Sequence, residues 1–454
     1  TVMDVAGNNI TVNNDGESVV TGKDSIVAVL TGDYITINNN GNTIVDGGTA
    51  STITGDHATL NNHGDVKTTN GGTGASIEGN FATVDNIGNI ISDGQGSVNT
   101  KITGNDAVVK QEGDQTVSGG AKGTVVTGNG AKITNKGKMS VTDADSVGIM
   151  VDGDNTFFSN TGDIDVSNSA TGISINGDTG NIALAGNMNV GDLAVGLNVS
   201  GDNNKMALAT NELNVTGQKA VGVNVTGGGN TIAITGNILV DKDETASDAL
   251  TYFSDKSAGV NVNGDDNNIT LDGSLTVVTD SEVTTRKGGQ RDGSLESITG
   301  LAVTGDGNSV TLNGGIQLKG EVGQLADGTT VADKRAGYGA SSIVEIDGHS
   351  SVYLNGDSTV SGDFPVGYSG LIQLSNGATL EIGEDATLNT QGVTSFEHFA
   401  VATPPVVYVQ SGSLLTNNGD IDVSNMVFAN VYNEGSSAIN NGSVTVTQNS
   451  QDPM

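Results

Sequence analysis

Cationic and aromatic side chains gather in one stretch of a chain that is otherwise strongly acidic. The formal net charge of the 454 residues is −34, yet all three arginines fall between residues 241 and 405. Guanidinium groups pair bidentately with sulfate or carboxylate, and aromatic rings stack on the faces of sugars. This combination predicts non-covalent binding of an extended acidic polysaccharide, such as a glycosaminoglycan. The candidate residues are Lys242, Tyr252, Phe253, Lys256, Arg286, Lys287, Arg291, Lys334, Arg335 and Tyr338.

The same stretch also contains acidic residues, among them Asp243, Glu244 and Asp248, so its local field need not be positive. The alternative is that these segments are solvated loops whose aromatic rings pin them to the rest of the fold. Long loops in a compact fold are usually functional or disordered.

A second set of candidates follows glycines that recur along the whole chain. An Asp stands directly after many of these glycines, and Asn80, Asn105 and Asn129 take that position in other copies. One such residue per copy predicts a ladder of acid and amide groups along one edge. This ladder can meet a basic patch on a partner protein, where complementary charge steers association. Asp and Asn are also ordinary turn formers, which is the simpler explanation. The candidates for protein binding are Asp154, Asp178, Asp202, Asp265 and Asp306.

The residue pattern gives catalysis little support. Asp265 and Asp266 are the obvious carboxylate pair for glycoside hydrolysis, but adjacent residues tend to point in different directions. Lys287 offers a base for a polysaccharide lyase. The four histidines are scattered, cysteine is absent, and the Gly-Gly-x-Gly-x-Asp calcium repeat does not occur in tandem. We therefore expect a non-enzymatic protein without cofactor or metal, and keep a lyase or hydrolase as an alternative.

The elements that position these residues are predicted from a short repeated phrase. Its clearest copy runs from Val221 to Val240 and contains three alternating apolar runs separated by Gly and Asn turns. Val221, Val223 and Val225 are expected to share one face. Closing glycines recur every 23–26 residues from Gly7 to Gly227. Three strands and three turns per copy predict an all-β, right-handed parallel triple-stranded β-helix, a solenoid of about sixteen rungs.

We expect one β-helix over residues 1–454, with plain rungs at 1–240, long loops at 241–405 and C-terminal rungs at 406–454. The insertions are predicted near Asp241–Ser257, Thr279–Ile298, Gly320–Ser341, Ser361–Ser369 and Gln391–Pro405. Each enters between the third strand of one rung and the first strand of the next. Loops that leave equivalent points of adjacent rungs stack side by side, so they are predicted to wall a groove for the acidic glycan.

The corner after the second strand carries a recurring Asn-x-Gly phrase, as in Asn62-His63-Gly64-Asp65-Val66 and Asn160-Thr161-Gly162-Asp163-Ile164. Stacked Asn residues at such a corner can hydrogen-bond from rung to rung. These phrases, in an acidic chain without cysteine, resemble the passenger domains of type V autotransporter adhesins of the diffuse-adherence and antigen-43-like class. The resemblance implies a β-helix exported across the outer membrane to the bacterial surface and followed by a membrane β-barrel, which is not in this sequence. It also leaves open self-association that aggregates cells and builds biofilms.

The amino-acid composition excludes some classes of binding partner. A net charge of −34 argues against nucleic acid, because phosphate binding needs a basic face. No apolar run of 18 residues occurs, so no transmembrane helix is expected within the chain. We expect the chain to be cut from a longer protein, with its signal peptide and membrane anchor elsewhere.

Overall fold

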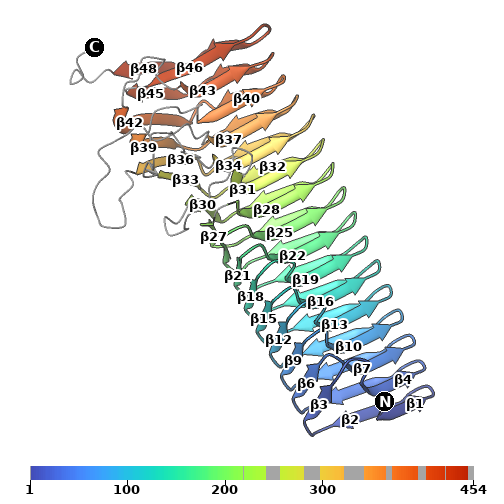
Figure 1. Ribbon diagram of the computed structural model, residues 1–454. Coiled ribbons are helices and arrows are strands. Elements are labelled where there is room, and N and C mark those ends of the chain that lie inside the picture. The colour runs from blue at the N-terminus through green and yellow to red at the C-terminus, as the bar shows by residue number, and fades with distance from the viewer. Residues whose placement is uncertain are drawn as a thin grey trace, which may run out of the picture. The chain divides into compact units, whose positions relative to one another are not determined.

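The computed structural model describes residues 2–217, 219–241, 256–280, 297–321, 342–364, 371–396, 405–424 and 426–447. Within these residues every regular element is a β-strand. Strands alternate among three parallel sheets, so that three consecutive strands make one rung (Figure 1). This arrangement confirms the predicted all-β solenoid, with sixteen strands in each sheet.

The first sheet contains β1 Met3–Ala6, β4 Ile26–Thr31, β7 Thr49–Thr54, β10 Thr73–Glu78, β13 Val98–Thr103, β16 Lys122–Thr127, β19 Val147–Asp152, β22 Thr171–Asn176, β25 Val195–Ser200, β28 Val221–Thr226, β31 Lys256–Asn263, β34 Ser297–Thr304, β37 Ser342–Asp347, β40 Ile372–Ser375, β43 Pro405–Gln410 and β46 Val427–Tyr432. The second contains β2 Thr11–Asn14, β5 Thr36–Asn39, β8 Thr59–Asn62, β11 Thr83–Asn86, β14 Val108–Gln111, β17 Lys132–Asn135, β20 Phe157–Asn160, β23 Asn181–Leu184, β26 Lys205–Leu208, β29 Thr231–Ile234, β32 Asn268–Leu271, β35 Ser309–Leu312, β38 Ser351–Leu354, β41 Thr379–Ile382, β44 Leu414–Asn417 and β47 Ser437–Asn440. The third contains β3 Ser18–Thr21, β6 Thr43–Asp46, β9 Val66–Thr69, β12 Ile90–Asp93, β15 Gln115–Ser118, β18 Met139–Thr142, β21 Ile164–Ser167, β24 Met188–Val190, β27 Glu212–Val215, β30 Asn237–Asp241, β33 Leu275–Asp280, β36 Ile316–Glu321, β39 Ser358–Phe364, β42 Thr387–Phe396, β45 Asp420–Ser424 and β48 Ser443–Thr447.

The chain divides into two compact units, which we describe separately. The first comprises Thr1–Thr210 with Asn224–Asn230, and the second comprises Asn211–Val223 with Thr231–Met454. In the first unit the core is a column of aliphatic side chains in register: Ile149 pairs with Ile173, which pairs with Leu197. All three are almost fully buried. Residues paired across neighbouring strands therefore point to the same side, and these three face the core.

One detail of the predicted strand pattern is wrong. Val221 does not share the inward face of Val223 and Val225 but is half-buried. The inward position beside Val223 is taken instead by Gly222, where an added Cβ would lie 3.0 Å from both methyl groups of Leu213. Two consecutive inward residues break the alternation, and glycine makes this tight packing achievable.

The recurring glycines form columns at two corners of each rung. A Cβ placed on Gly201 would lie 2.1 Å from the carbonyl oxygen of Gly177, and one on Gly162 would lie 2.0 Å from that of Gly137. Gly201 also has φ +142°, a region that L side chains rarely adopt. This backbone-to-backbone contact explains why glycine recurs at these positions, and the length of one rung sets the spacing between them.

Amide side chains stack inside the second corner, as expected. Asn135 Nδ2 donates to Asn160 Oδ1 at 2.6 Å and to the Gly137 carbonyl at 2.8 Å. Asn39 makes the same pair of bonds with Asn62 and Gly41. Asn135 and Asn160 are almost fully buried. Because a buried amide must be satisfied, these bonds fix the corner and the alignment of neighbouring rungs.

The five predicted insertions lie between a strand of the third sheet and the next strand of the first sheet. The fourth and fifth insertions begin later than predicted. Strand β39 continues to Phe364 and β42 to Phe396, so residues 361–364 and 391–396 are strand. Pairing of β39 with β42 explains the extension, since Gly362 and Phe364 find partners in Val393 and Phe396. The outermost residues of the other insertions are also strand, since β30 runs to Asp241, β31 begins at Lys256 and β33 runs to Asp280. The central inserted residues, 242–255, 281–296, 322–341, 365–369 and 397–404, lie outside the described part of the chain.

Candidate functional site: an acid and amide ladder beside a glycine groove

The candidate site begins where each strand of the first sheet ends. There the chain runs through a polar residue, a glycine, an Asp or Asn, and a residue in the left-handed region. In one rung these are Asp152, Gly153, Asp154 and Asn155, the last with φ 55°. Asn and Gly tolerate this backbone, so the sequence folds locally into a tight corner.

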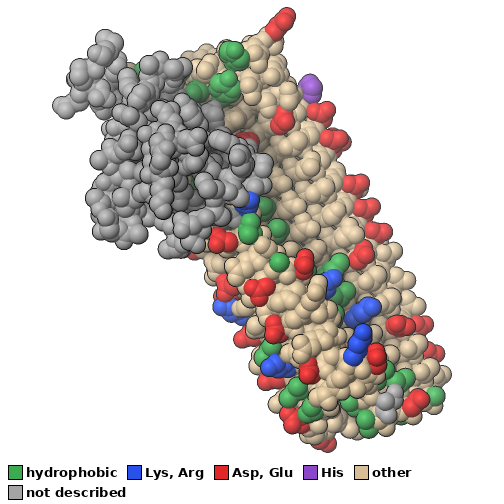
Figure 2. Space-filling view, viewed as in Figure 1, with side chains coloured by type: hydrophobic (Ala, Val, Ile, Leu, Met, Phe, Trp, Pro, Cys, Tyr) green, Lys and Arg blue, Asp and Glu red, His purple; other side chains and the backbone are tan. Residues whose placement is uncertain are grey.

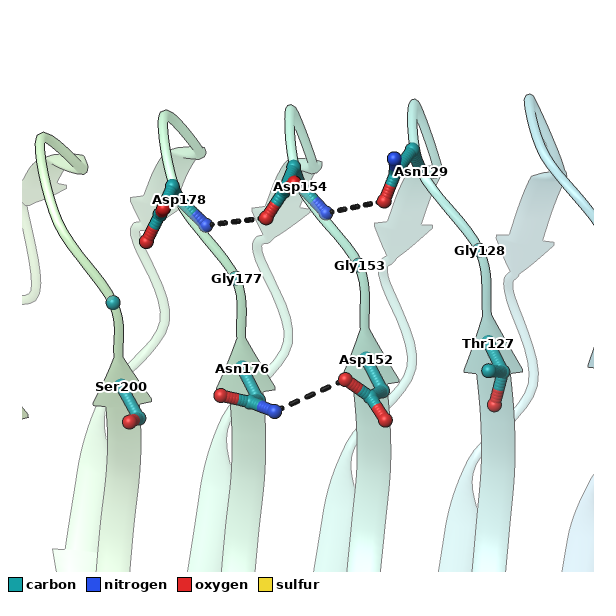
Figure 3. Close-up of a pocket in the computed structure, with 11 residues that line it drawn as sticks. Thr127, Gly128, Asn129, Asp152, Gly153, Asp154, Asn176, Gly177, Asp178 and Ser200 are labelled. Carbon is teal, nitrogen blue, oxygen red and sulfur yellow. Dashed lines mark hydrogen bonds between the residues drawn. The ribbon is translucent and has the colours of Figure 1, made fainter.

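The Asp or Asn after the glycine is fixed by the next rung. Its side-chain oxygen accepts a hydrogen bond from the backbone N–H of the equivalent residue one rung later. Asp154 N–H donates to Asn129 Oδ1 at 2.9 Å, and Asp178 N–H donates to Asp154 Oδ1 at 2.9 Å (Figure 3). We call this column the ladder; in the first unit it comprises Asn8, Asp33, Asp56, Asn80, Asn105, Asn129, Asp154, Asp178 and Asp202, which ends on Gly228 N–H.

The second unit has its own ladder segment. Asp306 N–H donates to Asp265 Oδ1 at 2.8 Å, and His349 N–H donates to Asp306 Oδ1 at 2.8 Å. The His349 ring nitrogen Nδ1 also lies 3.2 Å from the same oxygen. The backbone N–H of His349, followed by its ring, lowers the pKa of the Asp306 carboxyl below its ordinary value. Asp306 therefore stays ionised at a lower pH than an unpartnered Asp.

A shallow groove of about 480 Å³ runs beside the ladder in the first unit. Its floor is the glycine column, where no side chain rises. One wall is the ladder, and the other consists of the residues that end the strands (Figure 3). Within this second wall, Asn176 Nδ2 donates to Asp152 Oδ1 of the preceding rung at 3.0 Å. The lining residues are Thr127, Gly128, Asn129, Asp152, Gly153, Asp154, Asn176, Gly177, Asp178, Ser200 and Gly201.

Both walls of this groove carry negative charge. Asp152 stands on one side, and Asp154 and Asp178 stand on the other. Two lysines at the other corner are paired with carboxylates: Lys136 Nζ lies 2.7 Å from Glu112 Oε1, and Lys138 Nζ lies 2.6 Å from Asp165 Oδ2. Hydrogen bonding to these carboxylates raises the pKa of both lysines. Figure 2 shows acidic side chains following one edge of the stacked rungs.

This arrangement presents a row of oriented carboxylates along one corner of the first unit. Each ladder carboxylate is held rigidly by one backbone N–H, which leaves it oriented for a cationic partner without losing much side-chain entropy. Within the described residues, no group of three or more His, Asp or Glu side chains lies close enough to hold a metal ion. The ladder carboxylates can make charge-assisted hydrogen bonds along an extended surface.

The predicted ladder residues are therefore brought together in two groups. Asp154, Asp178 and Asp202 belong to the first unit, and Asp265 and Asp306 belong to the second. Of the predicted glycan-binding residues, Lys256 is the first residue of β31. The other nine, Lys242, Tyr252, Phe253, Arg286, Lys287, Arg291, Lys334, Arg335 and Tyr338, lie outside the described residues.

Sequence reasoning missed the second wall of the groove. Asp152 and Asn176 precede the repeated glycine, and the same position holds Thr127 and Ser200 in neighbouring rungs. A polar residue before each glycine was a visible signal. A second ladder at the next corner was also not predicted; there Asn89 N–H donates to Asp65 Oδ1 at 2.8 Å.

None of the described residues forms a helix long and apolar enough to cross a membrane. A family model described as the BigA third pectate lyase-like domain matches residues 370–454. No solved structure matches the chain. The matched part thus resembles a bacterial adhesin-like β-helix, as expected for a surface or extracellular protein, and the lyase-like name carries no evidence on catalysis in this chain.

Proposed function

We propose that the chain is part of a bacterial cell-surface adhesin that binds host matrix or surface molecules without transforming them. More specifically, we propose that it is an autotransporter passenger of the diffuse-adherence and antigen-43-like class, exported across the outer membrane. The β-helix and the likeness of residues 370–454 to the BigA domain support the surface role. Stacked rungs suit this role because they present the same side-chain position many times along one edge.

The observation that carries the proposal is the ladder beside its glycine groove. Asp154, Asp178 and Asp202 are preoriented by backbone N–H groups at 2.9, 2.7 and 2.7 Å. A basic surface on a host matrix protein, with fibronectin as the candidate, would meet several carboxylates at once. Complementary charge chiefly raises the association rate and the specificity of such a contact.

The test replaces Asp154, Asp178 and Asp202 together with Asn. Asn keeps the oxygen that accepts the backbone N–H, as Asn129 does, so the fold is retained while three charges are lost. Surface plasmon resonance on immobilised fibronectin should show at least a 10-fold weaker affinity, about 1.4 kcal/mol.

The matched control replaces Asp65, Asp114 and Asp163 with Asn. These residues accept backbone N–H groups in the same way at the other corner. The control removes the same charge from the same unit and should bind as the parent does. Equal loss in both variants would show that net charge alone governs binding and would reject the ladder.

An acidic glycan is the second ligand that we propose, held by the loops at 241–405. Replacing Arg286, Lys287, Arg291 and Arg335 together with Ala should abolish binding to heparin or chondroitin sulfate, and binding by the parent should weaken steeply with salt. Unchanged heparin binding by this variant would reject the glycan role of these residues.

Self-association is an alternative function, and an exposed amide column favours it. On the outer face of the second sheet Asn38 Nδ2 donates to Asn13 Oδ1 at 2.7 Å, and Asn61 Nδ2 donates to Asn38 Oδ1 at 2.8 Å. Such a polar face can pair with a copy of itself through many weak hydrogen bonds. Cells displaying the protein would then sediment faster than cells without it. For a lyase or hydrolase, the readout is unsaturated-sugar absorbance or new reducing ends on incubation with polyuronides.

A further inference from the structure

Three aromatic rings stack on the ladder corner of the first unit. The ring centroids of Tyr34 and His57 are 4.6 Å apart with planes 3° from parallel, and those of His57 and Phe81 are 4.8 Å apart at 10°. Each residue follows a ladder residue, Asp33, Asp56 or Asn80. We call Tyr34, His57 and Phe81 the aromatic column.

The backbone at these positions does not suit aromatic residues. All three have φ 58°, in the left-handed region that bulky L residues rarely adopt. Most equivalent residues of other rungs are usual occupants of that region, such as Asn9, Asn155 and Asn203, and Thr179 is a further exception. Aromatic rings in three consecutive rungs are therefore not required by the turn itself, and strained backbone of this kind is often found at functional sites.

The column is open at its Phe81 end. The next residue in the series is Asp106, with φ 56°. Its Oδ1 occupies the space that a side chain at Gly130, one rung further on, would fill, so the carboxylate leans away from Phe81. Phe81 is 47% exposed and Tyr34 is 55% exposed. One rung spacing above Phe81, a planar group would extend the stack.

The surroundings of the column are anionic. Asp33 and Asp56 precede two of the rings, Glu78 ends the strand that leads to Phe81, and Asp106 follows beyond it. The backbone of the column is fixed, because Tyr34 N–H donates to the Asp56 carbonyl at 2.9 Å and Phe81 N–H donates to the Asn105 carbonyl at 2.8 Å. The rings themselves are ordered by stacking on one another. Rigid rings beside carboxylates attract a cation and repel an acidic glycan.

We propose that the aromatic column is a binding site for an arginine side chain of a partner protein, whose guanidinium stacks on the open face of Phe81 and pairs with Asp106. A guanidinium is planar, stacks on rings and pairs with a carboxylate, whereas the compact ammonium of lysine cannot continue a stack. The site uses none of the carboxylates tested above, so it stands or falls independently of the proposed function.

The test uses fluorescein-labelled peptides of alternating Gly and Arg, with Gly-Lys peptides of the same length beside them, followed by anisotropy at low salt. The parent should bind the Arg peptide at least 5-fold more tightly than the Lys peptide. Phe81→Asn and Asp106→Asn should each weaken Arg-peptide binding at least 5-fold. Asn suits the left-handed backbone, so circular dichroism and thermal unfolding should show a folded protein.

The matched control is Phe157→Asn, which removes another exposed ring, on the second sheet. It should leave Arg-peptide binding unchanged. Equal binding of Arg and Lys peptides would overturn the stacking, and unchanged binding in Phe81→Asn would overturn the site. If a neutral cello-oligosaccharide binds in a Phe81-dependent way while the Arg peptide does not, the column is a sugar platform and the proposal is wrong.

Discussion

Gly201 illustrates why single residues in this chain are so constrained. A Cβ at this position would meet the Gly177 carbonyl oxygen at 2.1 Å, and the backbone is in the left-handed region. Neither problem can be relieved by a side-chain rotation, because the obstacle is the backbone of the previous rung.

Gly201→Ala should therefore destabilise the protein by about 2–4 kcal/mol, combining backbone strain with overpacking. Urea denaturation followed by circular dichroism measures this. Gly16→Ala is the control, since a Cβ there has nothing within 4 Å, and its effect should stay within about 0.5 kcal/mol. Equal effects of the two substitutions would show that the glycine columns do not control rung stacking.

The ladder also predicts a pH effect at Asp306. The backbone N–H and ring of His349 lower the pKa of Asp306 in the folded protein. A lowered folded pKa stabilises the protein above the unfolded value, about 3.9, and the contribution disappears as pH falls through the folded value. The urea midpoint of the parent should thus exceed that of Asp306→Asn at neutral pH, and the difference should vanish in acid. A difference that grew on acidification would contradict this account.

At this scale the ladder was predictable and the aromatic column was not. An Asp or Asn after a repeated glycine marks a repeated side-chain position, and repetition alone places its copies on one edge. Tyr34 and Phe81 offered no such signal, because a turn apex in the left-handed region normally holds Asn, Asp or Gly. The stacking of the rings follows from the rung spacing, which is visible only in the fold.

Among the elements, the corner after the second sheet depends on its buried amides. Asn135 is fully buried; it donates to Asn160 and Gly137 and accepts from Gln115 Nε2 at 2.9 Å. Removing this side chain would leave Gln115 of the preceding rung and Asn160 of the following rung without this partner, which costs more than the hydrogen bonds themselves contribute.

Asn135→Ala should destabilise the protein by about 2–4 kcal/mol in urea denaturation. Asn61→Ala removes an amide from the solvent-facing column of the second sheet, where water replaces the lost Asn38 contact, and should cost less than about 1 kcal/mol. Comparable losses of stability at the two positions would mean that burial does not determine how much these amide hydrogen bonds contribute to the free energy of unfolding.

Strand positions were predictable from alternation, while strand ends were not. The runs near Val221, Ile232 and Ile238 coincide with β28, β29 and β30. Gly222 escaped prediction because an inward glycine carries no apolar signal, and its place depends on the Leu213 methyl groups across the core. The ends of β39 and β42 depend on pairing between strands far apart in the sequence, which a local pattern cannot reveal.

For the molecule as a whole, repetition links the fold to binding. In a solenoid each rung contacts its neighbours, so a favourable surface position recurs at the rung spacing and weak contacts accumulate along an edge. The first unit applies this principle to carboxylates, from Asp33 to Asp202. A partner that contacts several of these groups gains affinity that a single exposed ion pair does not provide.

The most direct test of this account is the salt dependence of fibronectin binding by the parent and by the Asp154, Asp178 and Asp202 to Asn variant. Screening shortens the reach of exposed charges as ionic strength rises from about 0.05 to about 0.5 M. We predict that the parent loses affinity steeply over this range, while the variant binds weakly throughout with a much flatter slope. Parallel slopes for the two proteins, at equal affinity, would contradict binding through the ladder.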